Sequence, residues 1–294
     1  MSSLLDKLVD PVLERYGVPE WVKPYVLKYV KVNPANTVKF AASFIDVKRK
    51  KGEITSEYIR LPNGLKFRKD HILHLLNIVF YGEESMSHIA DAWAGKGLDS
   101  NRDYAAHFRD MGAKDSKHAR AIKNLIEGLG RKPEKPQQEI AEVFNYVANL
   151  DSWYDRVLAT ELILRNSYAK TFGLIFYKVF YPVSPEFMRS FGKAFALADP
   201  ESAWGASEAR KIIETRLLSD EHIIELTRAI LVRIQKSVDA NMRLAKASGI
   251  ESEAKLLSDI AIAYPLQTLS TMGVKVNIGK EISRIRKEAA KLKY

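Results

Sequence analysis

Four long stretches of this chain repeat apolar residues at alternating three- and four-residue steps. This is the spacing of one buried face of an α-helix. The stretches cover about residues 68–95, 100–128, 137–180 and 200–248. Gly97, Gly130, Pro182 and Gly249 follow their last turns, as helix-terminating residues do. Strand patterns are nearly absent, so the sequence predicts an all-α fold.

The segments on either side of these helices have a different pattern. Residues 1–66 predict short helices broken by prolines, then a small hairpin around Asn63 and Gly64. Residues 250–294 predict one or two helices broken by Pro265 and Gly273. We therefore expect three parts: an N-terminal extension over 1–66, a helical bundle over 67–249, and a C-terminal extension over 250–294.

Each of the four long helices carries an acidic residue within its apolar stripe. These acids are Glu83, Asp115, Glu161 and Asp220, and His118 lies on the same face as Asp115. The helical spacing therefore points all of these side chains toward the core.

The acids also lie at matching depths if the helices form antiparallel hairpins. Glu83 lies 14 residues before Gly97, and Asp115 lies 15 residues after Ser100. At about 1.5 Å of rise per residue, the two acids would meet at one level. Two antiparallel hairpins packed together would form a four-helix bundle with the acids near its middle.

A second hairpin would bring Glu161 and Asp220 level as well, 21 residues before Pro182 and 20 after Pro200. Four buried carboxylates repel one another, and each loses its hydration. Two divalent cations would neutralise them. Oxygen ligands with an imidazole suit iron or manganese, so the sequence predicts two divalent metal ions, most naturally iron.

This pattern resembles the ferritin-like di-iron carboxylate bundles, which include ferritins, rubrerythrins and related oxidases and hydroxylases. That family places a lone Glu on two helices and Glu-x-x-His on the other two. Here Glu83 and Glu161 resemble the lone acids, and Asp115-Ser-Lys-His118 resembles the first acid-x-x-His with Asp in place of Glu. The resemblance covers about residues 68–248.

The fourth helix departs from the family pattern. Asp220 is followed three positions later by Ile223, and His222 is preceded three positions earlier by Ser219. The second acid-x-x-His is therefore missing or displaced. Glu221 or His222 could serve as a ligand instead if the helix were rotated or bulged.

Several residues have alternative interpretations. Glu84 could replace Glu83, and Glu84 with His88 could form a separate ligand pair four residues apart. Asp115 and His118 could form a salt bridge only, and Arg165 could pair with Glu161 one turn away.

Aromatic and other histidine residues also have two interpretations. Tyr154 and Tyr168 flank Glu161 by seven residues each way; they are core aromatics or, beside a metal, hydrogen-bond donors or oxidisable groups. His71, His74 and His107 are interpreted as ordinary core or surface histidines. The aromatic segment 172–195 could line an apolar substrate channel.

Composition narrows the compartment and the chemistry. The absence of cysteine among 294 residues excludes disulfides, thiolate metal sites and thiol catalysis. Neither a signal peptide nor a membrane-length apolar stretch is evident, so we expect a soluble cytoplasmic protein. The net charge of +10 would suit nucleic acid or another polyanion, although the basic residues are scattered and the densest run lies at 46–53.

The resemblance implies an enzyme: a di-iron or mixed manganese/iron oxidase or hydroxylase that uses dioxygen, an organic substrate and an electron donor. A homodimer is compatible with this function. The alternatives are a non-catalytic helical module that binds nucleic acid or another polyanion, and a ferritin-like protein whose metal site has degenerated.

Overall fold

A computed structural model describes residues 53–55, 57–60, 66–97, 101–169, 201–247 and 251–294. Within these ranges the fold is helical apart from one small sheet, which confirms the all-α prediction. None of the described helices is both long and apolar enough to cross a membrane. The expected short helices of the N-terminal extension, the basic run and the aromatic segment fall almost entirely outside the described residues.

The small sheet precedes the first long helix. Its strands are β1 (Glu53–Ile54), β2 (Tyr58–Arg60) and β3 (Lys66–Arg68), in that order and antiparallel. Tyr58 pairs with Arg68 and Arg60 with Lys66, so β2 and β3 pair as the predicted hairpin requires. Asn63 and Gly64 themselves lie outside the described residues. The third strand, β1, was not expected from the sequence.

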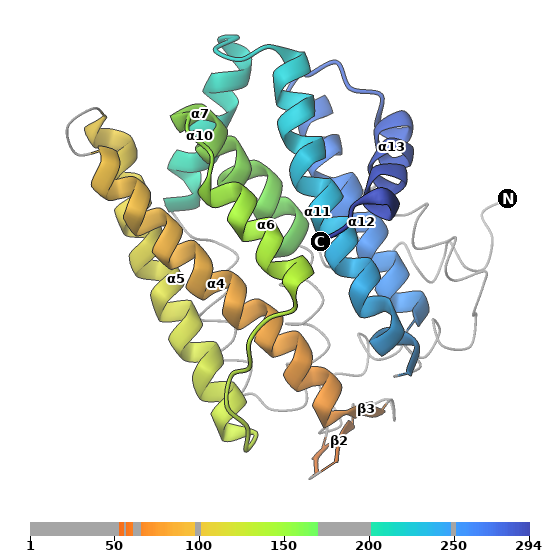
Figure 1. The fold of residues 1–294 in the computed structure, drawn as a ribbon. Helices are drawn as coiled ribbons and strands as arrows, with labels where there is room; N and C mark the ends of the chain where they lie inside the picture. The colour runs from red at the N-terminus through yellow and green to blue at the C-terminus, as the bar shows by residue number, and fades with distance from the viewer. Residues whose placement is uncertain (1–52, 56, 61–65, 98–100, 170–200, 248–250) are drawn as a thin grey trace, which may run out of the picture.

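Helices α4 (Lys69–Gly97) and α5 (Arg102–Gly128) form an antiparallel hairpin (Figure 1). Asn101 caps α5 by accepting a hydrogen bond from the backbone N–H of Tyr104. The two helices approach closely at Gly112, where an added Cβ would lie 2.5 Å from Asp91 Oδ1. Ser87 Oγ donates to Gly112 O at 3.0 Å across the same contact. The hairpin therefore fixes the relative height of its two helices.

The prediction of one continuous helix over 137–180 is wrong. It comprises α6 (Gln138–Ala148), a break, α7 (Trp153–Val157) and a π-helix, η2 (Leu158–Ala169). The break has a local cause, since Ser152 caps α7 by accepting from the backbone N–H of Asp155. The remainder of that expected helix lies outside the described residues.

The predicted helix over 200–248 is also interrupted. It divides into α10 (Glu201–Glu214) and α11 (Asp220–Ala247). Arg216 between them has φ +57°, the left-handed conformation that ends helices. Ser219 Oγ then accepts from the backbone N–H of His222 and starts α11. Asp220 is consequently the first residue of a helix and does not lie in the middle of one.

The last two helices are α12 (Glu251–Thr271) and α13 (Ile278–Lys291). The expected break at Pro265 is wrong, because α12 continues through it. Proline removes the N–H that would bond to the carbonyl of Ala261, but Ser167 Oγ donates to that carbonyl at 2.8 Å. The break expected at Gly273 is confirmed, with φ +90° directly after α12.

One hydrophobic core joins these helices. It includes residues of every helix from α4 to α13, with Trp93, Phe108 and Leu162 among its fully buried members. In Figure 1, α6 lies between the α4–α5 hairpin and α11, and α12 and α13 lie beyond α11. The π-helix η2 contacts α10, α11 and α12. Glu161 of η2 lines one cavity together with Glu83 and Asp115 of the hairpin.

Candidate metal centre

The α4–α5 hairpin brings together three side chains of the predicted ligand set. Glu83 comes from α4, and Asp115 and His118 come one turn apart from α5. His118 Nδ1 lies 3.1 Å from Glu83 Oε2 and 3.9 Å from Asp115 Oδ1. One ligand atom from each residue falls within 4.8 Å of the others, the only such group of three in the described part of the chain. This spacing would let all three contact one ion.

The two carboxyl groups of this cluster are electrostatically unfavourable together. Burial raises the pKa of Asp115 well above its usual range, and the charge of Glu83 raises it further. Arg165 lowers the same pKa, and Glu161 raises it. The side-chain contact with Glu83 also raises the pKa of Asp115. A metal ion bound here would favour the ionised form of Asp115 instead.

Glu161, from η2, forms a second polar group next to the first. Its Oε1 lies 3.1 Å from His107 Nε2, and its Oε2 lies 2.9 Å from Arg165 NH1. The Glu161 side chain is 2% exposed. Gly205 of α10 packs against it so closely that an added Cβ would lie 2.3 Å from the Glu161 Cδ atom. Glu161 is therefore held in place on several sides.

His107 belongs to this site, although its sequence position suggested an ordinary histidine. Its side chain is 9% exposed, and its ring packs against Trp204 with centroids 4.5 Å apart. A signal for it existed in the sequence. His107, Met111 and Asp115 follow one another at four-residue steps and thus share one face of α5. The ligand set predicted from the sequence included His118 of α5 but not His107.

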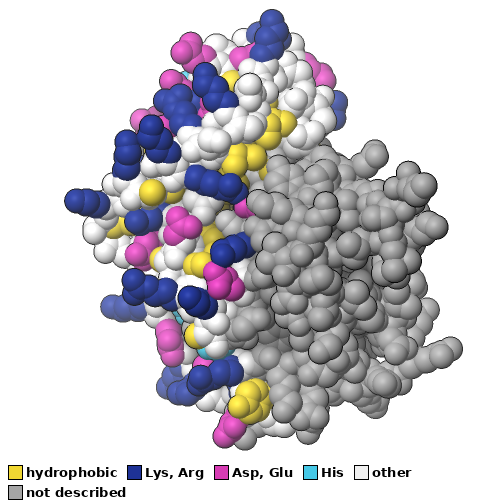
Figure 2. All heavy atoms as spheres, turned by 90° about the vertical axis from the view of Figure 1, so that its right-hand side faces the viewer, with side chains coloured by type: hydrophobic (Ala, Val, Ile, Leu, Met, Phe, Trp, Pro, Cys, Tyr) yellow, Lys and Arg dark blue, Asp and Glu magenta, His cyan; other side chains and the backbone are white. Residues whose placement is uncertain are grey.

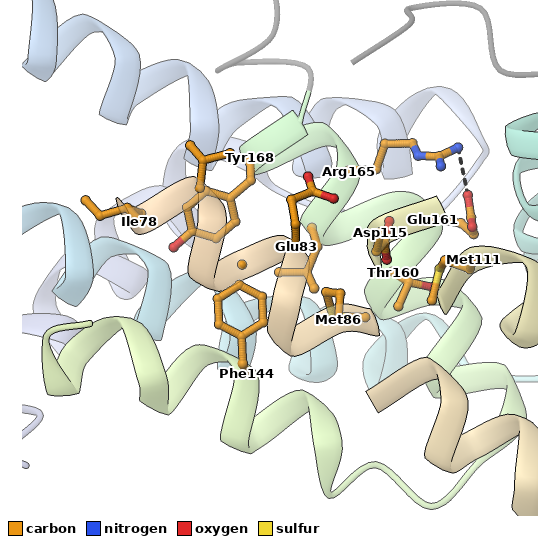
Figure 3. A pocket seen from close by; sticks show the side chains of 13 residues that line it. Ile78, Glu83, Met86, Met111, Asp115, Phe144, Thr160, Glu161, Arg165 and Tyr168 are labelled. Carbon is orange, nitrogen blue, oxygen red and sulfur yellow. Dashed lines mark ion pairs between the residues drawn. The ribbon is translucent and has the colours of Figure 1, made fainter. Parts of the chain in front are cut away.

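Two cavities border the acids. The smaller, of about 150 Å³, lies between α4, α5, α6 and η2. Figure 3 shows its apolar end at Ile78, Phe144 and Tyr168 and its polar end at Glu161 and Arg165. The larger, of about 320 Å³, is lined by α5, η2 and Trp204 of α10. Met111, Asp115, Glu161 and Arg165 line both cavities.

The π-helical form of η2 is unusual. A run of twelve residues, Leu158–Ala169, has this geometry. π-Helical turns are rare and are found frequently at functional sites. Thr160, Glu161, Leu164, Arg165 and Tyr168 from this run all line the smaller cavity. The irregular helix thus supplies one whole wall of the site.

Asp220 does not join the cluster. It pairs with Arg216, and its Oδ2 accepts from the backbone N–H of Lys275 at 3.1 Å. These contacts join the α10–α11 connection to the α12–α13 connection. The expectation that Asp220 meets the other three acids is therefore wrong, and the reason is the chain reversal at residues 215–219.

The alternative ligands lie elsewhere too. Glu221 and His222 are exposed, and His222 Nε2 lies 2.8 Å from Asp155 Oδ1. Glu84 and His88 are both exposed, so they lie on the solvent side of α4, away from Glu83.

The two predicted tyrosines differ in their surroundings. Tyr168 lines the smaller cavity and stacks on Phe144 with centroids 6.5 Å apart. Burial raises the pKa of Tyr168 to about 12, so its phenol keeps its proton at neutral pH. Tyr154 lines neither cavity and instead packs near Tyr104, with centroids 6.4 Å apart. Only Tyr168 is placed to contact a molecule in the smaller cavity.

No protein-family model matches the chain, and no curated protein matches it in sequence. On the described part of the face in Figure 2, Lys and Arg side chains are intermixed with Asp and Glu side chains. The site itself therefore carries the functional interpretation.

Proposed function

We propose that this protein is a metal-dependent oxidase or hydroxylase of the ferritin-like type, acting with dioxygen on a small organic molecule. The observation that carries the proposal is the convergence of Glu83, Asp115 and His118 beside the two cavities. We assign α4 and α5 to the first hairpin of a ferritin-like bundle, and η2 to its third helix.

The charges of the site fit a bound cation. Glu83, Asp115 and Glu161 contribute three negative charges, and Arg165 contributes one positive charge. Lys114 lines only the larger cavity, together with the exposed Asp103 and Asp110. One divalent ion would balance the inner set. Carboxylate oxygens and an imidazole nitrogen suit iron or manganese.

The chain's residues have distinct roles in this proposal. Glu83 and Asp115 would bind the ion as carboxylates, and His118 would bind through a neutral nitrogen. Three protein ligands leave coordination positions open for reactants, as catalytic metal sites do. A bound iron or manganese ion would supply the redox chemistry that dioxygen requires.

The smaller cavity would hold the substrate. Its size, about 150 Å³, is similar to that of cavities that admit benzene-sized molecules. Phe144 and Tyr168 would exclude water from the apolar end, whereas Thr160 and Glu161 would face the reacting end (Figure 3). We expect a substrate that is largely apolar and small.

Anaerobic addition of Fe²⁺ followed by exposure to oxygen tests this function. The wild-type protein is expected to bind iron stoichiometrically and to consume oxygen, and His118→Ala and Glu83→Gln are expected to lose both. His88→Ala is the matched control, because His88 is an exposed histidine on the same hairpin. Equal iron binding by wild type and His118→Ala would reject the proposed centre.

A further inference from the structure

We propose that Arg165 occupies the place of a second cation, so that the centre binds one metal ion and holds a latent second site at Glu161 and His107. This inference rests on the proposed function for the first ion, at Glu83, Asp115 and His118. It differs from the two-ion expectation because the second positive charge belongs to the protein itself.

The first support is the geometry around Glu161. Each carboxylate oxygen has one nitrogen neighbour, His107 Nε2 at 3.1 Å and Arg165 NH1 at 2.9 Å. Figure 3 shows the Arg165 guanidinium facing the Glu161 carboxylate. Gly205 closes the space over Glu161, so the carboxylate cannot easily turn away. The guanidinium thus sits where a cation bound to Glu161 would contact Oε2.

The second support is His107. Its side chain is nine-tenths buried, and its Nε2 points at Glu161 Oε1 without forming an aligned hydrogen bond. A buried imidazole nitrogen without a hydrogen-bond partner is uncommon, and such an atom is a good metal ligand. Packing against Trp204 holds the ring in this orientation. A ligand-type nitrogen and a carboxylate therefore already face each other.

The third support is charge. With Arg165 present, one divalent ion brings the set of three acids and one arginine to neutrality. A second divalent ion would leave a charge of +2 in a buried site, which is strongly unfavourable. If Arg165 were removed, the three acids with one divalent ion would carry a net charge of −1. A second ion would then meet no positively charged side chain at Glu161. Arg165 thus decides how many ions the centre takes.

Asp115 connects the two halves of the site. It lines both cavities, as Glu161 and Arg165 also do. Once Arg165 is absent, the latent site would have Glu161 and His107 as its protein ligands, and both line the larger cavity with Asp115.

Metal stoichiometry tests the inference without reference to activity. The full-length protein is stripped with a chelator and dialysed anaerobically against Mn²⁺, and the bound metal is measured by elemental analysis. Wild type is expected to bind one ion per chain, and Arg165→Ala is expected to bind two. Arg165→Gln, which retains most of the side-chain volume, is the second variant should Arg165→Ala fold poorly.

Two matched controls sharpen the result. Arg165→Lys keeps the positive charge and should bind one ion, and the double variant Arg165→Ala/His107→Ala should return from two ions to one. Two ions in wild type, or one ion in both neutral variants at position 165, would overturn the inference while leaving the first site intact. No ion in wild type would instead reject the proposed function.

Discussion

Buried and half-buried acids have different partners at the two ends of this fold. Around α13, each buried acid has its own arginine: Glu281 pairs with Arg228 at 2.7 Å, and Asp259 pairs with Arg286. At the candidate centre, Glu83, Asp115 and Glu161 have only Arg165 among the residues lining the smaller cavity. Arginines thus neutralise the buried acids of the C-terminal region, whereas the acids of the centre outnumber its arginine.

This difference separates structural ion pairs from a binding site. A paired buried acid needs nothing from outside, because its partner compensates the lost hydration. Carboxyl groups crowded together without matching cations must hold protons or attract an ion. The raised pKa of Asp115 indicates that its ionised form is unfavourable in the metal-free protein.

The largest expected effect comes from removing one arginine on each side of the comparison. Arg228→Ala leaves Glu281 buried without a cation and should lower the free energy of unfolding by about 3–5 kcal/mol. Arg165→Ala should cause a similar loss in chelator, since Glu161 then loses its arginine and keeps only His107 beside it. Urea denaturation in chelator and in Mn²⁺ measures both variants.

The responses to Mn²⁺ should differ between these two variants. Mn²⁺ should restore stability to Arg165→Ala beyond what it adds to wild type, and should not compensate Arg228→Ala in that way. Arg284→Ala, which removes only an exposed pair with Glu288, is the control and should change little. If Mn²⁺ rescued neither variant, the distinction between the two regions would be lost.

A somewhat smaller effect is expected from metal binding to the wild-type protein. Mn²⁺ at one hundred times its dissociation constant should raise the free energy of unfolding by about 2.7 kcal/mol. Glu83→Gln should abolish this stabilisation, and His88→Ala should retain it. Thermal denaturation at several Mn²⁺ concentrations provides the measurement, and an equal shift in both variants would contradict the site.

The smallest effect is expected from relieving the carboxyl pair. Because the pKa of Asp115 is raised in the folded state, its contribution to stability is full below the unfolded value of about 3.9 and is lost as pH rises through the folded value. Asp115→Asn should therefore make the metal-free protein more stable at neutral pH, by about 0.5–2 kcal/mol.

The pH dependence provides the check on that variant. In chelator, as the pH rises from about 3.9 toward neutrality, the free energy of unfolding of wild type should decrease relative to that of Asp115→Asn. Asp110→Asn, which changes an exposed acid on the same helix, should follow wild type. A variant less stable than wild type at neutral pH would show that Asp115 is favourably paired without metal.

The sequence was sufficient to predict the α4–α5 hairpin of the site, but not the expected second hairpin with Glu161 and Asp220. Helical spacing and helix length were sufficient to place Glu83, Asp115 and His118 together, because α4 and α5 are uninterrupted and joined by a short connection. The same reasoning failed for Asp220. A single cap at Ser219 and one left-handed residue at Arg216 divided the helix, and apolar periodicity does not detect such local breaks.

His107 was missed for a different reason. Its partner, Glu161, lies on another helix 54 residues away, and no local pattern links them. The π-helical form of η2 was equally hidden, since its sequence also fits an α-helical stripe. Contacts between distant segments decided these features, and they required the three-dimensional structure.

The most direct test of the account is the position of bound metal in crystals of the full-length protein grown with Mn²⁺. Anomalous diffraction is expected to show one ion per chain, contacted by Glu83, Asp115 and His118, with Arg165 still paired to Glu161. Crystals saturated with Mn²⁺ that hold no ion at these three residues would contradict the central claim.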